Sequence, residues 1–560
     1  MSEGGAIYSR SLKEIALSPQ ARELIGIAAE KVSPPQLINA ILKMPVELLW
    51  FGGIGTYVRA TTETDDAVGD RANDPLRVTG AELKCKVIGE GANLGMTQRG
   101  RVEAALAGVR LNTDAIDNSA GVNTSDVEVN IKIALMPALR DGRLTREARD
   151  VLLKEMTDDV GALVLRNNYL QPLSLSLAER RGLADLGFQQ RLMQSLERRG
   201  QLDRAVEFLP TDTELAERRR RSQPLTRPEL AVLLAYAKLS LYGELIESNV
   251  PDDPYFGREL DRYFPPALVQ RFPDAPQRHR LRREIIATAL ANSIINRGGP
   301  ACAVRIEDQT GAPAARMAQA FAAVRDSYGM TALNAEIDAL DNRIPERAQR
   351  ELYGAVQDLL HDRLVWFLRN VDLSRGLADI VGHYGRGIAA VEASLAEVLT
   401  GEAAAARAAR AAELERQGVG EALSRRFANL PALIAAPDII CVADRTGQPI
   451  AQAAATYFAA ASFFRLDRIA QAARAIEVSD YFDRLALDRA LDQIGDAERR
   501  VTAAMAGNGA AGAGAVEAWI ASRRQEVDRI REQVQEIAHS GLTVSKLTVA
   551  ASLLGDLVRQ

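Results

Sequence analysis

The chain has 560 residues, a net charge of −5 and a hydrophobic content of 47%, which is enough apolar sequence for more than one core. The negative charge argues against a nucleic-acid-binding surface. No uncharged apolar run reaches about 18 residues, and the first residues lack the features of a signal peptide, so we expect a cytoplasmic protein with no membrane partner. Cys85, Cys302, Cys441 and four histidines lack metal-site spacing, so we expect no metal and reduced thiols.

Residues 1–140 alternate short apolar runs with helical patterns, which predicts a parallel sheet. Ser18 and Ser33 each precede a proline and predict helix starts, with helices that run to about Lys31 and Lys43. Strands are predicted at 46–50, 84–89 and 111–116, and further helices at 97–107 and 125–137. Three strands are too few for a complete doubly wound sheet, so we expect the C-terminal half of a Rossmann-type domain.

From residue 141 onward the apolar periodicity is helical. The clearest predicted helices are 144–165, 227–243, 280–296, 316–328, 345–371 and 377–399, with connections at 167–177, 251–276 and 298–311. We expect a helical domain over 141–400 and a helical extension over 401–560, with a flexible Gly/Ala-rich linker near 505–515. The expected fold is an α/β remnant of a Rossmann-type parallel sheet followed by a large all-α region, predominantly helical overall.

Two segments rich in glycine and asparagine carry the clearest functional signal. Residues 87–95 read VIGEGANLG and residues 117–125 read DNSAGVNTS, and each leads from an apolar run into a helix. Glycine lets backbone approach a ligand, while Asn and Ser side chains offer hydrogen-bonding groups. Because the carboxyl ends of parallel strands share one edge of a sheet, these segments predict a ligand crevice at that edge.

Each of these signals also has a purely structural explanation. The turn at Gly52, Gly53 and Gly55 lacks the full spacing of a dinucleotide fingerprint, and a tight turn with positive φ accounts for its glycines equally well. Asn93 could close its own turn. Ser125, followed three residues later by Glu128, matches a capping box at a helix start, a role compatible with ligand contact.

Taken together, the motifs resemble those of the large bacterial NAD-specific glutamate dehydrogenases. The segments that carry the resemblance are 46–57 (VELLWFGGIGTY), 69–74 (GDRAND), 89–98 (GEGANLGMTQ), 117–125, 168–174 (NYLQPLS), 225–231 (LTRPELA) and 283–292 (REIIATALAN). The resemblance runs through almost the whole chain. It corresponds to the C-terminal portion of such an enzyme, namely the end of the NAD-binding domain and the C-terminal helical domain.

The resemblance implies NAD as the cofactor and L-glutamate or 2-oxoglutarate as the substrate. The cofactor-binding residues that it implies are Gly52, Gly53, Gly91, Asn93 and Asn118. It also places Asn118 and Ser125 at the substrate, with Ser125 contacting the distal carboxylate. Dehydrogenases of apolar amino acids resemble this motif but carry an apolar residue where Ser125 stands, so glutamate is favoured.

The catalytic lysines, catalytic aspartate and Gly-rich phosphate loop of the family have no match in this sequence. None of its nine lysines lies in a family lysine motif, so we assign no catalytic residue here and expect the chain alone to be an inactive fragment. The intact enzyme, which we expect to be a homo-oligomer, would oxidatively deaminate L-glutamate to 2-oxoglutarate and ammonia. Two alternatives stay open: a non-catalytic helical scaffold or regulatory partner, and an apolar amino-acid dehydrogenase.

Overall fold

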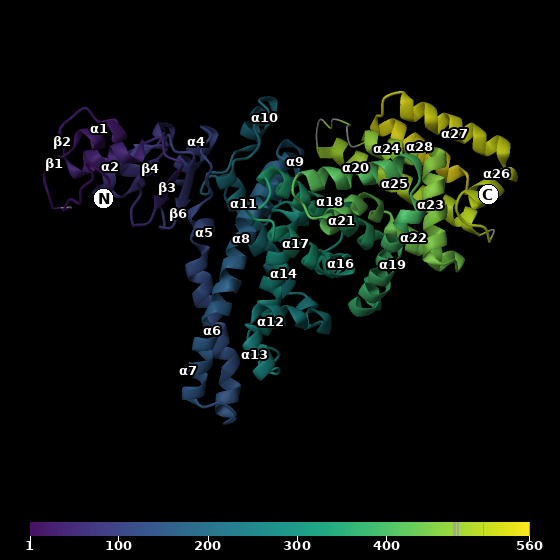
Figure 1. Cartoon of the computed structure of the whole chain (residues 1–560), viewed down its shortest axis with the longest axis horizontal. Helices are drawn as coiled ribbons and strands as arrows, with labels where there is room; N and C mark the ends of the chain where they lie inside the picture. The colour runs from purple at the N-terminus through teal and green to yellow at the C-terminus, as the bar shows by residue number, and fades with distance from the viewer. Residues whose placement is uncertain (10, 474–475, 477, 479–480, 508, 559–560) are drawn as a thin grey trace. The chain divides into compact units, whose positions relative to one another are not determined.

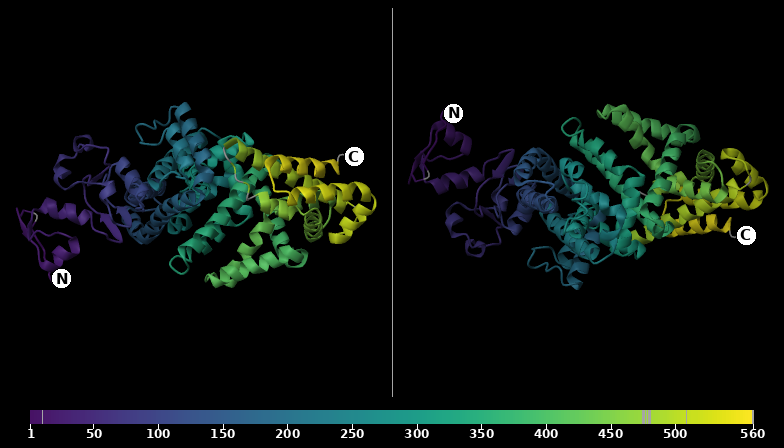
Figure 2. Two further views of the ribbon diagram at one scale, coloured as in Figure 1. Left: turned by 90° about the horizontal axis from the view of Figure 1, so that it is seen from above. Right: turned by 90° about the horizontal axis from the view of Figure 1, so that it is seen from below.

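The computed structural model describes the whole chain except residues 10, 474–475, 477, 479–480, 508 and 559–560. It is 71% helical with small parallel-sheet fragments, which confirms the predicted fold class. The chain divides into two compact units, Met1–Val304 and Arg305–Gln560. The domain limits predicted near 140 and 400 differ from this division and stay predictions. Figure 1 shows strands only in the purple N-terminal segment, and Figure 2 shows the remaining ribbon as helices.

Three two-stranded sheets form the α/β part of the first unit. They pair β1 (Ile15–Ala16) antiparallel with β2 (Lys31–Val32), β3 (Leu48–Phe51) parallel with β6 (Val87–Glu90), and β4 (Val58–Arg59) parallel with β5 (Val78–Thr79). A buried apolar cluster, which includes Phe51, Val58, Ile88, Met96 and Leu111, lies beneath β3, β4 and β6. Burial of these side chains supplies the main stabilisation of this small sheet region.

The first two helices begin where the sequence predicted them. Ser18 caps α1 (Pro19–Ile25), and Ser33 closes a capping box at the start of α2 (Pro34–Leu42). The predicted end of the first helix at Lys31 is wrong, because Gly26 adopts a left-handed conformation (φ 76°) that terminates α1. Lys31 instead begins β2.

The predicted third strand at 111–116 is wrong, because these residues form no strand. The residue just before them does pair with β6. Arg110 forms a single parallel bridge with Val87, through hydrogen bonds from Ile88 N to Arg110 O (2.9 Å) and from Arg110 N to Lys86 O (2.9 Å). The next residues then turn into α5 (Asp114–Asp117). The polar sequence Asn-Thr-Asp at 112–114 favours a helix start over a continued strand.

The helices that follow complete the first unit. They are α3 (Asp65–Val68), α4 (Gln98–Leu106), α6 (Ser119–Arg140), α7 (Arg146–Glu155), α8 (Thr157–Arg181), α9 (Leu183–Arg198), α10 (Asp212–Arg220), α11 (Arg227–Ile246), α12 (Gly257–Tyr263), α13 (Pro266–Arg271), α14 (Arg282–Gly298) and α15 (Cys302–Thr310), the last crossing into the second unit. Helices α6 and α8 pack side by side (Figure 1). The predicted connection at 167–177 lies inside α8, because packing of α8 against α6, α11 and α14 outweighs the backbone hydrogen bond lost at Pro172.

The second unit is helical throughout its described residues. Its helices are α16 (Ala314–Ser327), α17 (Met330–Asp338), α18 (Glu346–Asn370), α19 (Leu377–Val398), α20 (Gly401–Arg416), α21 (Glu421–Leu433), α22 (Ala436–Thr446), α23 (Ile450–Phe464), α24 (Leu466–Ala473), α25 (Tyr481–Ala506), α26 (Gly512–Ala521), α27 (Arg524–His539) and α28 (Val544–Asp556). The predicted linker near 505–515 is partly wrong, because residues 505–506 lie in α25 and residues 512–515 lie in α26. Residues 507–511 connect the two helices, and residue 508 is outside the described residues. The predicted connections at 251–276 and 298–311 are also mainly helical, the latter containing α15.

Among the described residues, no single helix is long and apolar enough to cross a membrane. One pair of helices, α21 and α22, reaches that length and apolar composition only when the two are taken together, and they are bent by 59° at the break between them.

Candidate functional site

The carboxyl ends of β3 and β6 meet at one edge of the small parallel sheet. The two strands pair in register from Leu48 opposite Val87 to Phe51 opposite Glu90. Gly52 and Gly53 follow β3 directly, and the Gly91-to-Gly95 turn follows β6. The two turns therefore lie next to each other at the edge where parallel sheets bind ligands.

Asn93 and Asn118, which the sequence placed in one site from separate motifs, are in contact. The Asn118 side-chain nitrogen donates to Asn93 Oδ1 across 2.5 Å. Two aspartates of α5 hold this arrangement, because Asp114 Oδ2 accepts from the backbone N–H of Leu94 (2.8 Å) and Asp117 Oδ2 accepts from that of Glu90 (3.0 Å). Both aspartates thus tie the Gly-Asn turn to the helix that leads into Asn118.

A buried ion pair lies beneath the same turn and was not predicted from the sequence. Arg101 of α4 donates through Nε and Nη2 to the two carboxylate oxygens of Glu90, at 2.7 and 2.9 Å, and Nη2 also lies 3.1 Å from Asp114. Burial alone would lower the pKa of Arg101, but the hydrogen bond to Glu90 and the neighbouring carboxylates raise it. Nothing in the spacing of these residues signals the pair, because it forms only when strand and helix pack together.

Ser125 does not cap a helix. Helix α6 begins at Ser119, so Ser125 lies within it, and its hydroxyl contacts the Gly121 carbonyl oxygen at 3.5 Å. The predicted capping box with Glu128 is therefore wrong. Ser125 is exposed and stands seven residues after Asn118, which puts both on one face of the helix and about 10 Å apart along its axis.

The glycines of the turn after β3 are of two kinds. One needs glycine for its backbone conformation, and the other two have space for a side chain. Gly55 has a φ of 129°, and an added Cβ would lie 2.3 Å from the Asn73 side-chain nitrogen, so the tight-turn explanation holds there. Gly52 and Gly53 have no positive φ, are exposed, and have room for a Cβ. The backbone conformation therefore does not account for these two glycines.

An indole ring lies against Gly91 and leaves no room for a side chain there. A Cβ on Gly91 would be 2.5 Å from the Trp50 ring, and one on Gly89 would be equally close. Trp50 is 60% exposed and was not singled out in the sequence. Its ring thus forms a flat apolar surface over the ends of β3 and β6, where both turns begin.

The segment 69–74 supports the glycine turn after β3. Asp70 Oδ2 accepts hydrogen bonds from the Thr56 backbone N–H (2.8 Å) and from the Asn73 side chain (2.7 Å). The bond from the Thr56 amide, followed by that from Asn73, lowers the pKa of Asp70. This motif therefore acts as a structural brace that fixes the shape of the turn.

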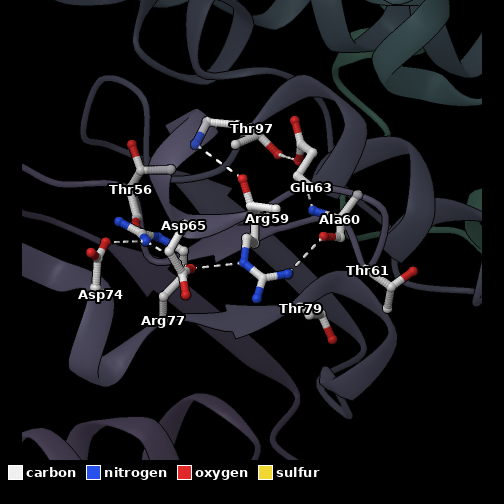
Figure 3. A network of polar contacts seen from close by, with 12 residues as sticks. Thr56, Arg59, Ala60, Thr61, Glu63, Asp65, Asp74, Arg77, Thr79 and Thr97 are labelled. Carbon is white, nitrogen blue, oxygen red and sulfur yellow. Dashed lines mark hydrogen bonds and ion pairs between the residues drawn. The ribbon is translucent and has the colours of Figure 1, made fainter. Parts of the chain in front are cut away.

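A polar network extends this brace into the interior of the α/β region (Figure 3). The side chain of Arg77 is almost fully buried and donates to the Thr56 carbonyl oxygen (2.9 Å) and to Asp65 (2.9 Å). Asp65 also accepts from Arg59 at 2.8 Å. Hydrogen bonds from Arg59 and then Arg77 lower the pKa of Asp65. Each ion of this network is paired, so removing one partner would leave a buried charge without compensation and would destabilise the turn.

Two motifs of the helical region reach the start of α6. From the segment 225–231, Arg227 donates to Asn112 Oδ1 (2.9 Å), and Asn112 in turn donates to Asp117 (2.7 Å). From the segment 168–174, Asn168 and Gln171 donate to the Ser119 hydroxyl oxygen at 2.9 and 3.1 Å. Both motifs thus fix the backbone on either side of Asn118.

Lys238 of α11 lies next to Gln171, a residue that donates to Ser119. Its Nζ donates to Gln171 Oε1 at 3.1 Å, and no carboxylate pairs with it among the described residues. Burial lowers the pKa of Lys238 to about 8. The described part of the chain contains no group of three or more His, Cys, Asp or Glu side chains suited to a metal ion.

Comparison with known proteins gives consistent matches along the chain. The model for the bacterial NAD-glutamate dehydrogenase catalytic domain matches residues 1–178, and the model for the C-terminal region of glutamate dehydrogenase matches residues 222–556. The NAD-specific glutamate dehydrogenase of Halomonas elongata is 41% identical over 540 residues, covering 96% of this chain and 33% of that protein. The proteins of the same name from Pseudomonas aeruginosa and Mycobacterium tuberculosis are 42% and 35% identical, covering 100% of this chain and 35% of each protein. The chain therefore spans about a third of the length of the curated relatives it matches.

Proposed function

This chain belongs to the family of bacterial NAD-specific glutamate dehydrogenases, and we propose that it forms the C-terminal part of an enzyme that oxidatively deaminates L-glutamate to 2-oxoglutarate and ammonia. The contact between Asn93 and Asn118 at the carboxyl edge of β3 and β6 is the observation that carries this proposal. It joins two separate family motifs at the expected ligand position of a parallel sheet.

The asparagine pair fits the carboxamide of a nicotinamide ring. Their mutual hydrogen bond uses the Asn118 nitrogen and Asn93 Oδ1, which leaves the Asn93 nitrogen as a donor and Asn118 Oδ1 as an acceptor. A carboxamide offers the complementary acceptor and donor. Gly52, Gly53 and Gly91 would line the adjoining part of the cofactor site. NAD, when bound there, accepts the hydride that the substrate loses.

Ser125 is suited to contact the distal carboxylate of glutamate. Its hydroxyl is exposed and has only a long contact with the Gly121 carbonyl oxygen, so it can turn to donate to a carboxylate. Ser125 and Asn118 are about 10 Å apart along α6. This distance leaves room for a small dicarboxylate beside the nicotinamide ring. In this arrangement Asn118 faces both cofactor and substrate.

We assign no catalytic acid or base to this chain. Its parallel sheet has two strands at the candidate site, and the turns that follow these two strands lack the G-x-G-x-x-G spacing of a phosphate loop, so the 560-residue polypeptide by itself should not reduce NAD. In the intact enzyme we expect a cytoplasmic homo-oligomer. These expectations rest on the family.

A chimera tests the proposal directly. In it, this chain replaces the matching third of the Pseudomonas aeruginosa relative, and glutamate-dependent NADH formation is followed by absorbance. We expect turnover from the chimera and none from the 560-residue chain alone. A chimera that folds and binds NAD without oxidising glutamate would contradict the proposal, and the parent enzyme serves as the positive control.

A further inference from the structure

A large cleft in the second unit is separate from the residues discussed above. It has a volume of about 2070 Å³ and is bordered by residues of α18, α20, α21, α23 and α25. Eight arginines and six acidic residues line it. The distribution of ion pairs among them decides whether the cleft has an uncompensated charge.

Four of the arginines are matched by carboxylates that also line the cleft. The pairs are Arg468 with Glu402 (2.9 Å), Arg499 with Asp438 (2.6 Å), Arg500 with Asp496 (2.9 Å), and Arg369 with Asp492. These side chains compensate one another. Three other arginines of the cleft, one on α18 and two on α20, have no carboxylate partner among the described residues.

Arg363 of α18 is a buried cation with a neutral partner. It is 8% exposed, and its Nη1 donates to the Ile434 carbonyl oxygen at 2.7 Å. Its Nε is buried without a hydrogen-bond partner, and no carboxylate pairs with the guanidinium within the described residues. Arginine does not deprotonate in proteins, so this buried charge is present without a carboxylate in direct contact.

Two further arginines lie one helical turn apart on α20. Arg407 Nε donates to Asn429 Oδ1 at 2.7 Å, while the Asn429 nitrogen donates to Glu392 at 3.1 Å. The asparagine therefore separates Arg407 from the carboxylate of Glu392. Arg410 has no hydrogen bond or ion pair in the described part of the chain.

Two of these three cations are bound along one helix, α21, and Arg410 is one turn from Arg407 on α20. Asn429 and Ile434, which hold Arg407 and Arg363, are five residues apart on α21 and at its C-cap, or about 7.5 Å along the helix axis. The adjacent lining residues Ala403, Ala406 and Ala432 are small and leave room beside the guanidinium groups. We name Arg363, Arg407 and Arg410 the arginine end of the cleft.

We propose that the arginine end binds a small-molecule anion that carries two or more phosphate or carboxylate groups. A buried guanidinium without a directly paired carboxylate is costly, and an anion that bridges several arginines offsets this cost through charge-assisted hydrogen bonds. A single anionic group would leave part of the charge unmatched. This site lies wholly in the second unit and does not depend on the proposed dehydrogenase activity.

Calorimetric titration of the 560-residue chain tests the site with two probes, inorganic pyrophosphate and malonate, at low ionic strength. We expect saturable binding of at least one probe, weakened tenfold or more in the double variant Arg407→Gln/Arg410→Gln and in Arg363→Met. Binding of pyrophosphate alone would identify a phosphate site, and binding of malonate alone a carboxylate site.

The matched control is Arg468→Gln, which removes an arginine of the same cleft that already pairs with Glu402. It should bind the probes within about threefold of the unmodified chain, since one rim charge contributes little. Circular dichroism confirms that each variant is folded, and the double variant changes only partly exposed side chains. Absence of saturable binding by either probe, or equal binding by the double variant, overturns the proposal.

Discussion

The side-chain amide of Asn118 donates to the side-chain carbonyl oxygen of Asn93 across 2.5 Å, although 25 residues separate them in the chain. The contact exists because Asp114 of α5 binds the backbone N–H of Leu94 in the Gly-Asn turn, and Asp117 binds that of Glu90, the last residue of β6. One short helix therefore positions both the turn after β6 and the first residue before α6. An exposed pair of amides is then held at the edge of the sheet.

Replacing Asn118 with alanine should impair catalysis without unfolding the protein. In the chimeric enzyme we expect Asn118→Ala to lower kcat/KM for glutamate about tenfold, since one hydrogen bond contributes about 1 to 1.5 kcal/mol. Asn167→Ala is the matched control, because Asn167 donates to Asn123 at 2.9 Å in another asparagine pair. An unchanged kcat/KM in Asn118→Ala, or an equal loss in the control, would favour a local structural role.

The sequence predicted that Asn93 and Asn118 would be neighbours from two adjacent strand ends, and they are in contact although the predicted strand at 111–116 is a single bridge at Arg110 followed by α5. The start of α6 was also predicted wrongly. Periodicity over 111–116 is compatible with a strand, and the outcome depends on how Asp114 and Asp117 bond to the turn after β6. The Glu90–Arg101 pair and the Trp50 ring likewise depend on packing between elements. Local patterns do not encode such contacts.

Helix positions show the same division between local and long-range information. Ser33 was a recognisable helix start because a proline follows it, and the structure shows a capping box there that involves residues three apart. Ser125 and Glu128 have the same spacing but lie inside a helix, since α6 already begins at Ser119. A local motif can therefore be present without its usual structure when neighbouring residues extend the helix.

Ser125→Val separates substrate contact from helix stability. We expect kcat/KM for glutamate to fall about 10- to 150-fold, because a hydroxyl bonded to a carboxylate contributes about 1.5 to 3 kcal/mol, while norvaline should be used equally well or better. The melting temperature should change little, since Ser125 does not cap α6. Thr145→Ala, which removes a true cap of α7, should cost about 1 kcal/mol of unfolding free energy. Equal losses on glutamate and norvaline would contradict the substrate role.

Gly55→Ala should destabilise the turn after β3 through two independent effects. The backbone φ of 129° strains any side chain, and the new Cβ would lie 2.3 Å from the Asn73 nitrogen. We expect a loss of about 3 kcal/mol in unfolding free energy. Gly69→Ala is the control, because Gly69 has a positive φ of 76° but open space around it, and should cost about 1 kcal/mol.

The double variant Gly55→Ala/Asn73→Ala distinguishes the two effects. If the steric contact contributes, the double variant should lose less stability than the sum of the single variants. Urea denaturation gives the three free energies. Strict additivity, together with equal losses for Gly55→Ala and Gly69→Ala, would show that the Asn73 brace does not constrain the glycine.

Replacing Lys238 with methionine should stabilise the protein in a pH-dependent manner. Burial lowers the pKa of Lys238 to about 8 in the folded protein, from its ordinary value of 10.5. Below pH 8 both states carry the charge and the folded state bears the full burial cost, about 3 kcal/mol. Between pH 8 and 10.5 the folded state has released its proton while the unfolded state retains it, so wild-type stability rises and the cost disappears.

Urea denaturation of Lys238→Met and the unmodified chain across this pH range measures the effect. The variant should be more stable by about 2 kcal/mol at neutral pH, because the lost hydrogen bond to Gln171 offsets about 1 kcal/mol of the gain, and the difference should shrink above pH 8. Lys546→Met is the control, since the exposed Lys546 Nζ also donates only to neutral oxygens, such as Ser540 O at 2.8 Å. A stability difference for Lys238→Met that does not vary with pH would show that the ammonium of Lys238 is not held at a cost, because only a shifted titration makes the difference depend on pH.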